Sequence, residues 1–209
     1  MCRTFGRSVN TIEEAIEAIA AGKAVIVMDD EDRENEGDII FAAQYATSEL
    51  MGWTIRYSSG VICIPMIRER AEKLALPPMV AHNEDPKGTA YTVSCDAAHG
   101  ITTGISANDR ALGARVLSDK KTTPADLTRP GHLFPLIAHD SLLQGREGHT
   151  EAAITLCSLA HLEPVGVLVE LVAEDGNMLR GQDVIDFAHK NNCPVITIEE
   201  LKKYPHEKK

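Results

Sequence analysis

The sequence lacks the features that mark membrane, secreted and zinc-binding proteins. No stretch of its 209 residues approaches the roughly 20 consecutive apolar residues that a membrane-spanning helix needs. Its first residues, MCRTFGRSVNTIEE, contain no apolar core of a signal peptide. The five cysteines are odd in number and form no CxxC pair, which favours free thiols over disulfides or a zinc site. These absences predict a cytoplasmic protein.

Positive charge is scarce and the common nucleotide-binding motifs are missing. Lys and Arg number 21 against 31 Asp and Glu, so the net charge is −10. This surplus disfavours broad attraction to nucleic acid or to an anionic membrane, and we predict neither as a partner. An anionic substrate would bind only where a local cation or a metal ion offsets the charge. Neither a GxxxxGKS/T motif nor a strand-borne GxGxxG motif is present, which argues against a nucleotide-binding enzyme.

What the sequence does contain is a mixture of helical and extended segments. The best-marked helix runs from Thr11 to Gly22, where Thr11 and Glu14 fit a capping box and Gly22 fits a C-terminal cap. Pro135 predicts that the extended segment around it is an edge strand or a bulged strand. Strands and helices do not alternate strictly and no linker divides the chain, so we predict an α+β fold with a mixed sheet in a single domain. We expect further helices at 47–57, 67–76, 106–117, 150–161 and 182–191, strands at 24–28, 39–43, 61–66, 91–95, 132–137, 165–172 and 195–198, and a loop at 82–89.

The densest charge of the chain lies between two segments that are predicted to be buried strands. Seven of the ten residues from Asp29 to Asp38 are acidic, and the alternating ones are Asp30, Asp32, Glu34, Glu36 and Asp38. If this segment is extended, the alternating carboxylates point to one side and repel one another unless a cation neutralises them. Most charge runs are solvated loops, but this one exceeds the usual length of a hairpin loop, which favours an arranged cation site. It is not an EF-hand, because the twelfth position of that motif would be Ala43.

A second candidate site is the segment GREGHTEAA, residues 145–153. Thr150 can cap the helix that follows, and Glu151 stands in its first turn, where the helix dipole favours a carboxylate. Arg146, Thr150 and the backbone N–H groups of the helix start can form a phosphate cradle, with His149 at its mouth. A plain capped helix with a surface histidine is an equally good interpretation of the spacing. A similar entry into a helix runs from Gly100 to Asp109, with donors on Thr102, Thr103 and Ser106.

Two further residues are candidates for acid–base chemistry. Glu170 lies in a strand that is apolar on both faces, where a carboxylate costs several kcal/mol unless it is paired or protonated. Burial raises the pKa of such an acid, which suits proton transfer at neutral pH, and an ion pair with a buried Arg is the alternative. His132 follows a Pro-Gly pair, which restricts the backbone as either a catalytic site or an ordinary turn would. Cys63 lies in an apolar segment and is predicted to be a core residue.

These segments together resemble one enzyme family, the 3,4-dihydroxy-2-butanone 4-phosphate synthases of riboflavin biosynthesis. The match runs in order from about Thr11 to Leu201, and the acidic decapeptide and GHTEA are its most specific parts. The resemblance implies one three-layer α+β domain over residues 1–209, with a twisted mixed sheet flanked by helices. It also implies a homodimer with active sites near the subunit interface and, because the chain ends at Lys209, a stand-alone synthase. The matching segments are DDEDRENEGD, RYSSG, LPPM, GTAYTV, TTGISANDR, RPGHLFPL, GHTEA and the strand of Glu170.

The resemblance further implies a reaction and a cofactor. D-Ribulose 5-phosphate would be converted to L-3,4-dihydroxy-2-butanone 4-phosphate and formate with the help of Mg²⁺ or Mn²⁺. Divalent ions held by carboxylates stabilise the negative charge that enolisation, dehydration and rearrangement place on oxygen. The alternative, from a different class, is a catalytically silent cation-binding or interaction protein, whose metal binding would not depend on His132 or Glu170.

Site residues carry over from the family position by position. Glu34 and His149 match the metal ligands, while His132 and Glu170 match the two residues regarded as essential for catalysis. One departure is Glu147, which stands beside the phosphate cradle where basic or small residues are usual. The implied substrate contacts are Arg33, Glu34, Asp38, Arg146, Glu147, Gly148, His149, Thr150 and Glu170.

Overall fold

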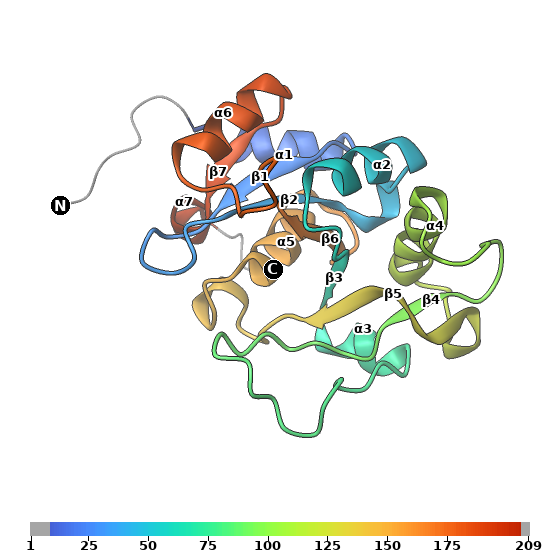
Figure 1. Cartoon of the computed structure of the whole chain (residues 1–209). Coiled ribbons are helices and arrows are strands. Elements are labelled where there is room, and N and C mark those ends of the chain that lie inside the picture. Colours follow the sequence, from blue (N-terminus) through green and yellow to red (C-terminus); the bar gives the residue numbers. More distant parts are fainter. Residues whose placement is uncertain (1–8, 206–209) are drawn as a thin grey trace.

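The computed structural model describes residues 9–205, and a seven-stranded sheet runs through it (Figure 1). The strands are β1 Val25–Met28, β2 Gly37–Ala42, β3 Cys63–Met66, β4 Cys95–Ala97, β5 Leu127–Ile137, β6 Gly166–Glu170 and β7 Val195–Thr197. Their order in the sheet is β4-β5-β3-β6-β2-β1-β7. Strand β1 runs parallel to β7 and β3 parallel to β5, while the other neighbours are antiparallel. The predicted mixed sheet is confirmed.

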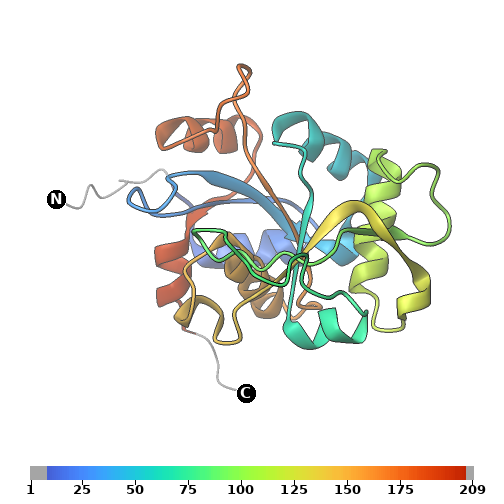
Figure 2. The same ribbon diagram turned by 60° about the horizontal axis from the view of Figure 1, so that its bottom comes forward.

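Helices cover both faces of this sheet and complete a three-layer α+β fold (Figure 2). The helices are α1 Ile12–Ala20, α2 Ser48–Tyr57, α3 Arg68–Lys73, α4 Ala107–Ser118, α5 His149–Leu159, α6 Gln182–Lys190 and α7 Ile198–Lys203, with short 3-10 helices η1 Ala43–Tyr45, η2 Pro124–Asp126 and η3 Leu142–Gln144. Buried residues of α2, α4 and α6, such as Met51 and Val184, join one apolar cluster. Those of α1, α5 and α7, such as Ile19 and Leu156, join a second. The central strands feed both clusters, because successive side chains point to opposite faces.

Several helix ends form as the sequence predicts. The Thr11 hydroxyl accepts from the backbone N–H of Glu14 (3.2 Å), and the Glu14 carboxylate accepts from the N–H of Thr11 (2.9 Å). Gly22 follows α1 with a φ of +74°, a conformation that costs glycine little. Ser106 caps α4. These signals act within a few residues of one another, so they do not depend on the rest of the fold.

One prediction near β5 is wrong, and another is confirmed in only one of its two alternatives. Residues 91–95 form no regular strand, since Tyr91 and Thr92 make only isolated bridges and β4 begins at the end of that segment. Strand β5 is not an edge strand, because it lies between β4 and β3. Pro135 fits there because its carbonyl oxygen accepts from Thr92 (3.0 Å), so its missing N–H faces the same irregular segment rather than β3. The bulged alternative is correct, since the ladder between β4 and β5 changes register.

Two helix starts also differ from prediction. The predicted strand at 195–198 ends at Thr197, whose side chain caps the unpredicted helix α7. Helix α5 begins at His149 with Gly148 as its N-cap, so Thr150 lies inside the first turn and does not cap the helix. The absence of a side-chain cap leaves the first N–H groups of α5 open to other partners.

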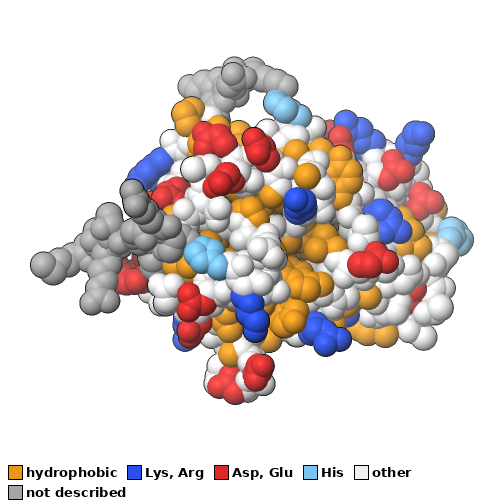
Figure 3. All heavy atoms as spheres, turned by 90° about the horizontal axis from the view of Figure 1, so that it is seen from above, with side chains coloured by type: hydrophobic (Ala, Val, Ile, Leu, Met, Phe, Trp, Pro, Cys, Tyr) orange, Lys and Arg blue, Asp and Glu red, His pale blue; other side chains and the backbone are white. Residues whose placement is uncertain are grey.

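The helices and the surface charge of the described residues bear on possible partners. Between residues 9 and 205, no helix combines the length and the apolar character that crossing a bilayer would need. On the face seen in Figure 3, acidic and basic side chains are scattered among apolar and neutral surface, and the described residues form no continuous basic patch there.

Candidate active site

The candidate site lies where one apolar face of the sheet ends in carboxylates. Towards α5, strands β2 and β6 present Ile40 and Leu168, which belong to the second apolar cluster. Two residues further along, on the same face of each strand, stand Asp38 and Glu170. These two residues are direct register partners in the antiparallel pair, so their side chains lie next to each other. Strand pairing thus brings two acids together at the margin of an apolar core.

Asp38 is buried in a way that disfavours its charged form. Only 3% of the residue is exposed. Burial raises the pKa of Asp38 well above its ordinary value, and the charges of Glu170 and Asp29 raise it further. Among the described residues its Oδ1 has no hydrogen-bond partner, and its Oδ2 lies 3.5 Å from Nδ1 of His149. Such an oxygen costs free energy unless a proton or a cation satisfies it.

The β1–β2 loop adds two more acids, and Asp29 organises it. The buried Asp29 carboxylate accepts from the backbone N–H groups of Glu34 (3.1 Å) and Glu36 (2.8 Å). Arg33 Nη1 donates to Asp29 (2.9 Å) and also to Glu34. The loop turns back on itself, with a φ of +55° at Asn35. Asp29 therefore holds the loop in a fixed shape with its side chain.

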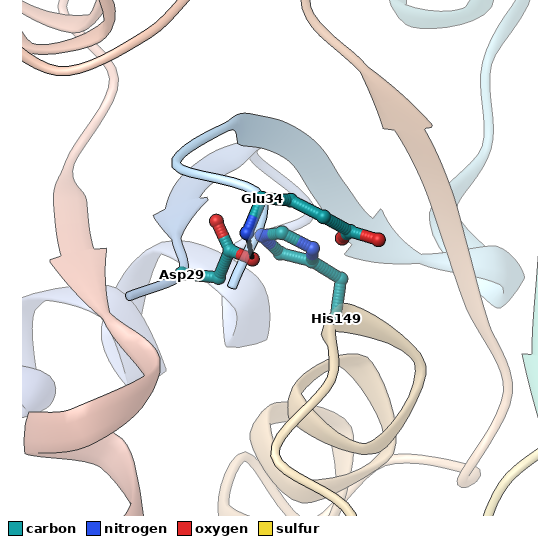
Figure 4. Close-up of side chains that lie close together, drawn as sticks. All are labelled: Asp29, Glu34 and His149. Carbon is teal, nitrogen blue, oxygen red and sulfur yellow. Dashed lines mark hydrogen bonds between the residues drawn. The ribbon is translucent and has the colours of Figure 1, made fainter. Parts of the chain in front are cut away.

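This segment is a turn and is not extended, so the predicted alignment of the alternating carboxylates on one side does not form. Asp30, Glu31 and Asp32 are exposed to solvent, whereas Asp29 is buried and Glu34 is half-buried and lies beside His149 (Figure 4). Asp29 is a site residue that the prediction missed. Its position directly after a buried strand was the available signal, because the strand fixes where the side chain begins.

His149 reaches this group from the first turn of α5 (Figure 4). Its Nε2 lies 3.1 Å from the carbonyl oxygen of Val27, which assigns the proton to Nε2 and leaves a lone pair on Nδ1. Burial lowers the pKa of His149 to about 4, so the ring is neutral at pH 7. One ligand atom each from Asp29, Glu34 and His149 lie within 4.8 Å of one another. The structure thus brings the two predicted metal ligands, Glu34 and His149, together.

The chemistry of these donors fits a divalent cation. Carboxylate oxygens suit Mg²⁺ and Mn²⁺, and Mn²⁺ accepts an imidazole nitrogen more readily. Both oxygens of Asp29 already accept backbone N–H groups, so Asp29 braces the loop while Glu34 and His149 are freer to bind an ion. The unsatisfied Oδ1 of Asp38 agrees with a positive charge nearby.

The predicted phosphate cradle consists of Arg146 lying across the start of α5. A Cβ atom on Gly148 would lie 2.2 Å from Arg146 Nη1, so glycine allows the guanidinium to approach the first turn of the helix. The same Nη1 donates to the buried carboxylate of Glu151 (2.7 Å), which fixes the arginine in place. Thr150 is buried in this first turn. The uncapped N–H groups and the guanidinium together suit an anion.

Two predicted contacts lie differently from expectation. Glu147 extends away from the cradle and pairs with Lys202 of α7 (2.5 Å), with 58% of its side chain exposed. Glu170 is only partly buried and accepts from the hydroxyl of Ser59 (2.7 Å), not from an arginine. The predicted burial is wrong because β6 ends at Glu170, where the carboxylate reaches the margin of the sheet.

His132 lies apart from all of these residues, in the bulge of β5. The ladder with β4 skips residues 129–132. Asp96 on β4 accepts from both the backbone N–H (2.9 Å) and the ring Nδ1 (2.7 Å) of His132, and sequence reasoning missed it. Gly104, with a φ of +96°, packs closely over this pair. Strand β5 is two positions from β6 and three from β2, or roughly 10 Å and 14 Å at the usual spacing between strands.

The structure also decides the role of the loop at 100–109 and of Cys63. The loop at 100–109 is not an open anion site, because Thr102 and Gly104 donate to the carboxylate of Asp109 (2.7 Å and 3.1 Å). These hydrogen bonds, with that of Thr102 the strongest, lower the pKa of Asp109 to about 2. Cys63 is a buried core residue, as predicted, and its burial raises the pKa of the thiol.

Comparison with known proteins agrees with this geometry. A family model described as 3,4-dihydroxy-2-butanone 4-phosphate synthase matches residues 13–204. The synthase of that name from Candida albicans is 54% identical over 194 residues, which cover 92% of this chain and 95% of the relative. That from Photorhabdus laumondii is 51% identical over 200 residues, covering 96% and 92%. A solved structure of such a synthase in complex with two magnesium ions has a TM-score of 0.89 at 46% identity, covering 92% of this chain and 94% of that chain.

Proposed function

The chain belongs to the 3,4-dihydroxy-2-butanone 4-phosphate synthase family, and we propose that it converts D-ribulose 5-phosphate to L-3,4-dihydroxy-2-butanone 4-phosphate and formate. Family membership makes it a lyase of riboflavin biosynthesis. The observation that carries the finer proposal is the convergence of Glu34, His149 and the Asp38–Glu170 pair beside the cradle of Arg146. A cation site, a pair of acids and an anion cradle are what a phosphorylated sugar with a reactive ketone requires.

The two ends of the site suit the two ends of this substrate. Arg146 and the first N–H groups of α5 suit the phosphate. Glu34 and His149 would hold Mg²⁺ or Mn²⁺ next to the hydroxyl and ketone oxygens. When bound, the ion stabilises the negative charge that develops on oxygen during enolisation. The magnesium ions in the related solved structure support this choice of cofactor.

Glu170 and Asp38 have different environments that suit different roles with protons. Glu170 is partly exposed, so its carboxylate can reach a substrate and move protons at the sugar carbons. Asp38 is buried with a raised pKa, so it can keep a proton and donate a hydrogen bond to a substrate hydroxyl. Because the two are register partners, the negative charge of Glu170 further disfavours the charged form of Asp38.

The position of His132 is a reason to propose a homodimer. In one chain, β5 lies roughly 14 Å from the strand of Asp38, too far for His132 to touch a substrate held there. The side chain of His132 is 40% exposed, so a second chain can approach it. In a twofold-symmetric dimer, His132 of each chain could complete the site of the other.

Formate release from D-ribulose 5-phosphate tests the proposed function directly. It is measured with and without Mg²⁺ for the wild type, for Glu170→Ala and for Glu147→Ala as a matched control that points away from the site. We expect Mg²⁺-dependent formate that falls about 10²–10⁴-fold in Glu170→Ala and is retained in Glu147→Ala. A folded, metal-loaded wild type that releases no formate would favour the catalytically silent cation-binding protein instead.

A further inference from the structure

We propose that Lys87 supplies a positive charge, in addition to that of Arg146, to the phosphate end of the site. This inference rests on the proposed function, because it names a further residue that contacts the phosphate of the substrate. Lys87 belongs to the loop at 82–89 and contacts both Arg33 of the acidic loop and Arg146, which lies just before α5.

Lys87 bridges the two arginines of the site. Its ammonium donates to the backbone carbonyl oxygen of Arg33 (2.9 Å), and its own carbonyl oxygen accepts from Nε of Arg146 (3.3 Å). Arg146 Nη2 also donates to the hydroxyl of Thr89 (3.2 Å). Lys87 therefore contacts both the cradle and the acidic loop, and an anion held by Arg146 lies within reach of its long side chain.

The charge of Lys87 is not shared with a carboxylate, whereas the charges of both arginines are. Arg33 and Arg146 each form ion pairs with carboxylates of the site. Across residues 9–205, Lys87 forms no ion pair, and its ammonium bonds to a neutral carbonyl group. Its full positive charge is thus available to an incoming anion.

The loop that carries Lys87 is braced by its own hydrogen bonds. The carboxylate of Asp85 accepts from the N–H of Thr89 (2.6 Å), and the Asn83 amide donates to the carbonyl oxygen of Thr89 (3.0 Å). Asn83 also accepts from the N–H of Asp85 (2.9 Å). The long, flexible lysine stem can therefore move its ammonium from the carbonyl oxygen to a phosphate while the loop stays in place.

The charge of the substrate explains the need for such a residue. A phosphate monoester carries about −1.5 to −2 charges at pH 7, and it must enter a protein of net charge −10 beside a cluster of carboxylates. A cation at the phosphate is far from the reacting carbons, so it stabilises the bound substrate and the transition state equally. Its loss should therefore raise KM and leave kcat nearly unchanged.

The experiment is calorimetric titration of the full chain with inorganic phosphate in EDTA. Lys87→Met removes the charge, Lys87→Arg keeps it, and Lys73→Met is the matched control, because Lys73 also donates to a backbone carbonyl group, that of Lys120 (2.8 Å). We expect Lys87→Met to weaken phosphate binding about tenfold and Lys87→Arg to change it less than about twofold. Lys73→Met should bind as the wild type does. The KM for D-ribulose 5-phosphate should rise about tenfold in Lys87→Met.

Three results would overturn the proposal. These are wild-type phosphate affinity in Lys87→Met, no phosphate binding by the wild type, and an equal loss in Lys87→Met and Lys87→Arg with a lower Tm. The last result would show that Lys87 only fastens one loop to another. Failure of the proposed function would give a different result from failure of this proposal. Phosphate binding would still depend on Lys87, but D-ribulose 5-phosphate would yield no formate.

Discussion

Two histidine–carboxylate pairs in this molecule show how burial changes the same chemistry. His149 and Asp38 are both buried, with 3.5 Å between Nδ1 of the histidine and Oδ2 of the aspartate, and burial lowers the pKa of His149 to about 4. His132 and Asp96 lie 2.7 Å apart, at a position where 40% of the histidine side chain is exposed. The buried ring stays neutral and suits a metal, whereas the exposed ring, held by its carboxylate, suits proton transfer.

The two pairs are also assembled differently. His149 comes from the start of α5 and Asp38 from β2, which pairs with β6 so that Asp38 lies opposite Glu170. Three elements therefore meet at this pair. His132 and Asp96 come from two neighbouring strands, and a bulge re-aims the histidine. A variant at His149 can therefore abolish metal binding while the His132–Asp96 pair stays intact. The following variants test whether the region of His149 and the region of His132 are separable in this way.

The largest expected effect is on Mn²⁺ affinity, which should fall in His149→Ala and not in His132→Ala. His149→Ala removes a proposed metal ligand. Loss of an outer-shell partner weakens metal binding about 10–100-fold, and we expect this variant to weaken Mn²⁺ binding at least as much. His132→Ala should bind Mn²⁺ as the wild type does. Calorimetric titration with Mn²⁺ checks both, and similar losses in the two variants would remove the distinction between the regions.

A glycine substitution should damage only the region of His132. In Gly104→Ala, the new Cβ atom would lie 2.2 Å from Asp96 Oδ2 and 2.5 Å from His132 Nδ1, at a φ of +96°. We expect the free energy of unfolding to fall by about 1–3 kcal/mol, with kcat reduced and Mn²⁺ affinity retained. Gly176→Ala is the control, because it shares a positive φ but meets nothing within 4 Å. Urea denaturation should show a larger loss for Gly104→Ala, and equal losses would mean that only backbone strain matters.

The corresponding glycine of the other region should affect substrate binding. In Gly148→Ala, the Cβ atom would displace Arg146 Nη1, which lies at the end of a flexible side chain. The fold should tolerate the change, while KM for D-ribulose 5-phosphate rises about tenfold through loss of a charge-assisted contact. Steady-state kinetics measure this effect. An unchanged KM would show that Arg146 does not bind the phosphate.

The smallest expected effect is a pH dependence in the region of His132. Hydrogen bonds from Thr102 and Gly104 lower the pKa of Asp109 to about 2, below the value of about 3.8 expected in the unfolded chain. The ionised carboxylate therefore stabilises the fold above pH 4, and this contribution is lost as the pH falls from about 4 to about 2. Asp109→Asn should be less stable than the wild type at neutral pH, and the difference should vanish towards pH 2. Urea midpoints across this range check it, and a constant difference would contradict the assignment.

Much of the fold was predictable because its signals are local. Thr11 and Glu14 determine the start of α1 within four residues, and Ser106 does the same for α4. The errors occur where a distant segment decides. Residues 91–95 alternate like a strand, but their neighbour is Pro135, which cannot donate a ladder hydrogen bond.

The candidate site was predictable in composition but not in arrangement. Glu34, Arg146 and His149 stand in motifs that family resemblance identifies, and the structure brings them close together. The pairing of Asp38 with Glu170 depends on the register between β2 and β6, which no local pattern encodes. The pairing of Asp96 with His132 depends on the bulge in β5 in the same way.

Formate release from a mixture of two variants tests most directly whether His132 of one chain completes the metal site of a second chain. Alone, His132→Ala and His149→Ala should each be inactive, the first for want of a proton carrier and the second for want of a metal ligand. Once subunits exchange, mixed dimers should contain one intact site, and about one quarter of wild-type activity should return, since half of the dimers are mixed. A mixture that stays inactive after exchange would contradict the account, because His132 would then not act on the metal site of a second chain.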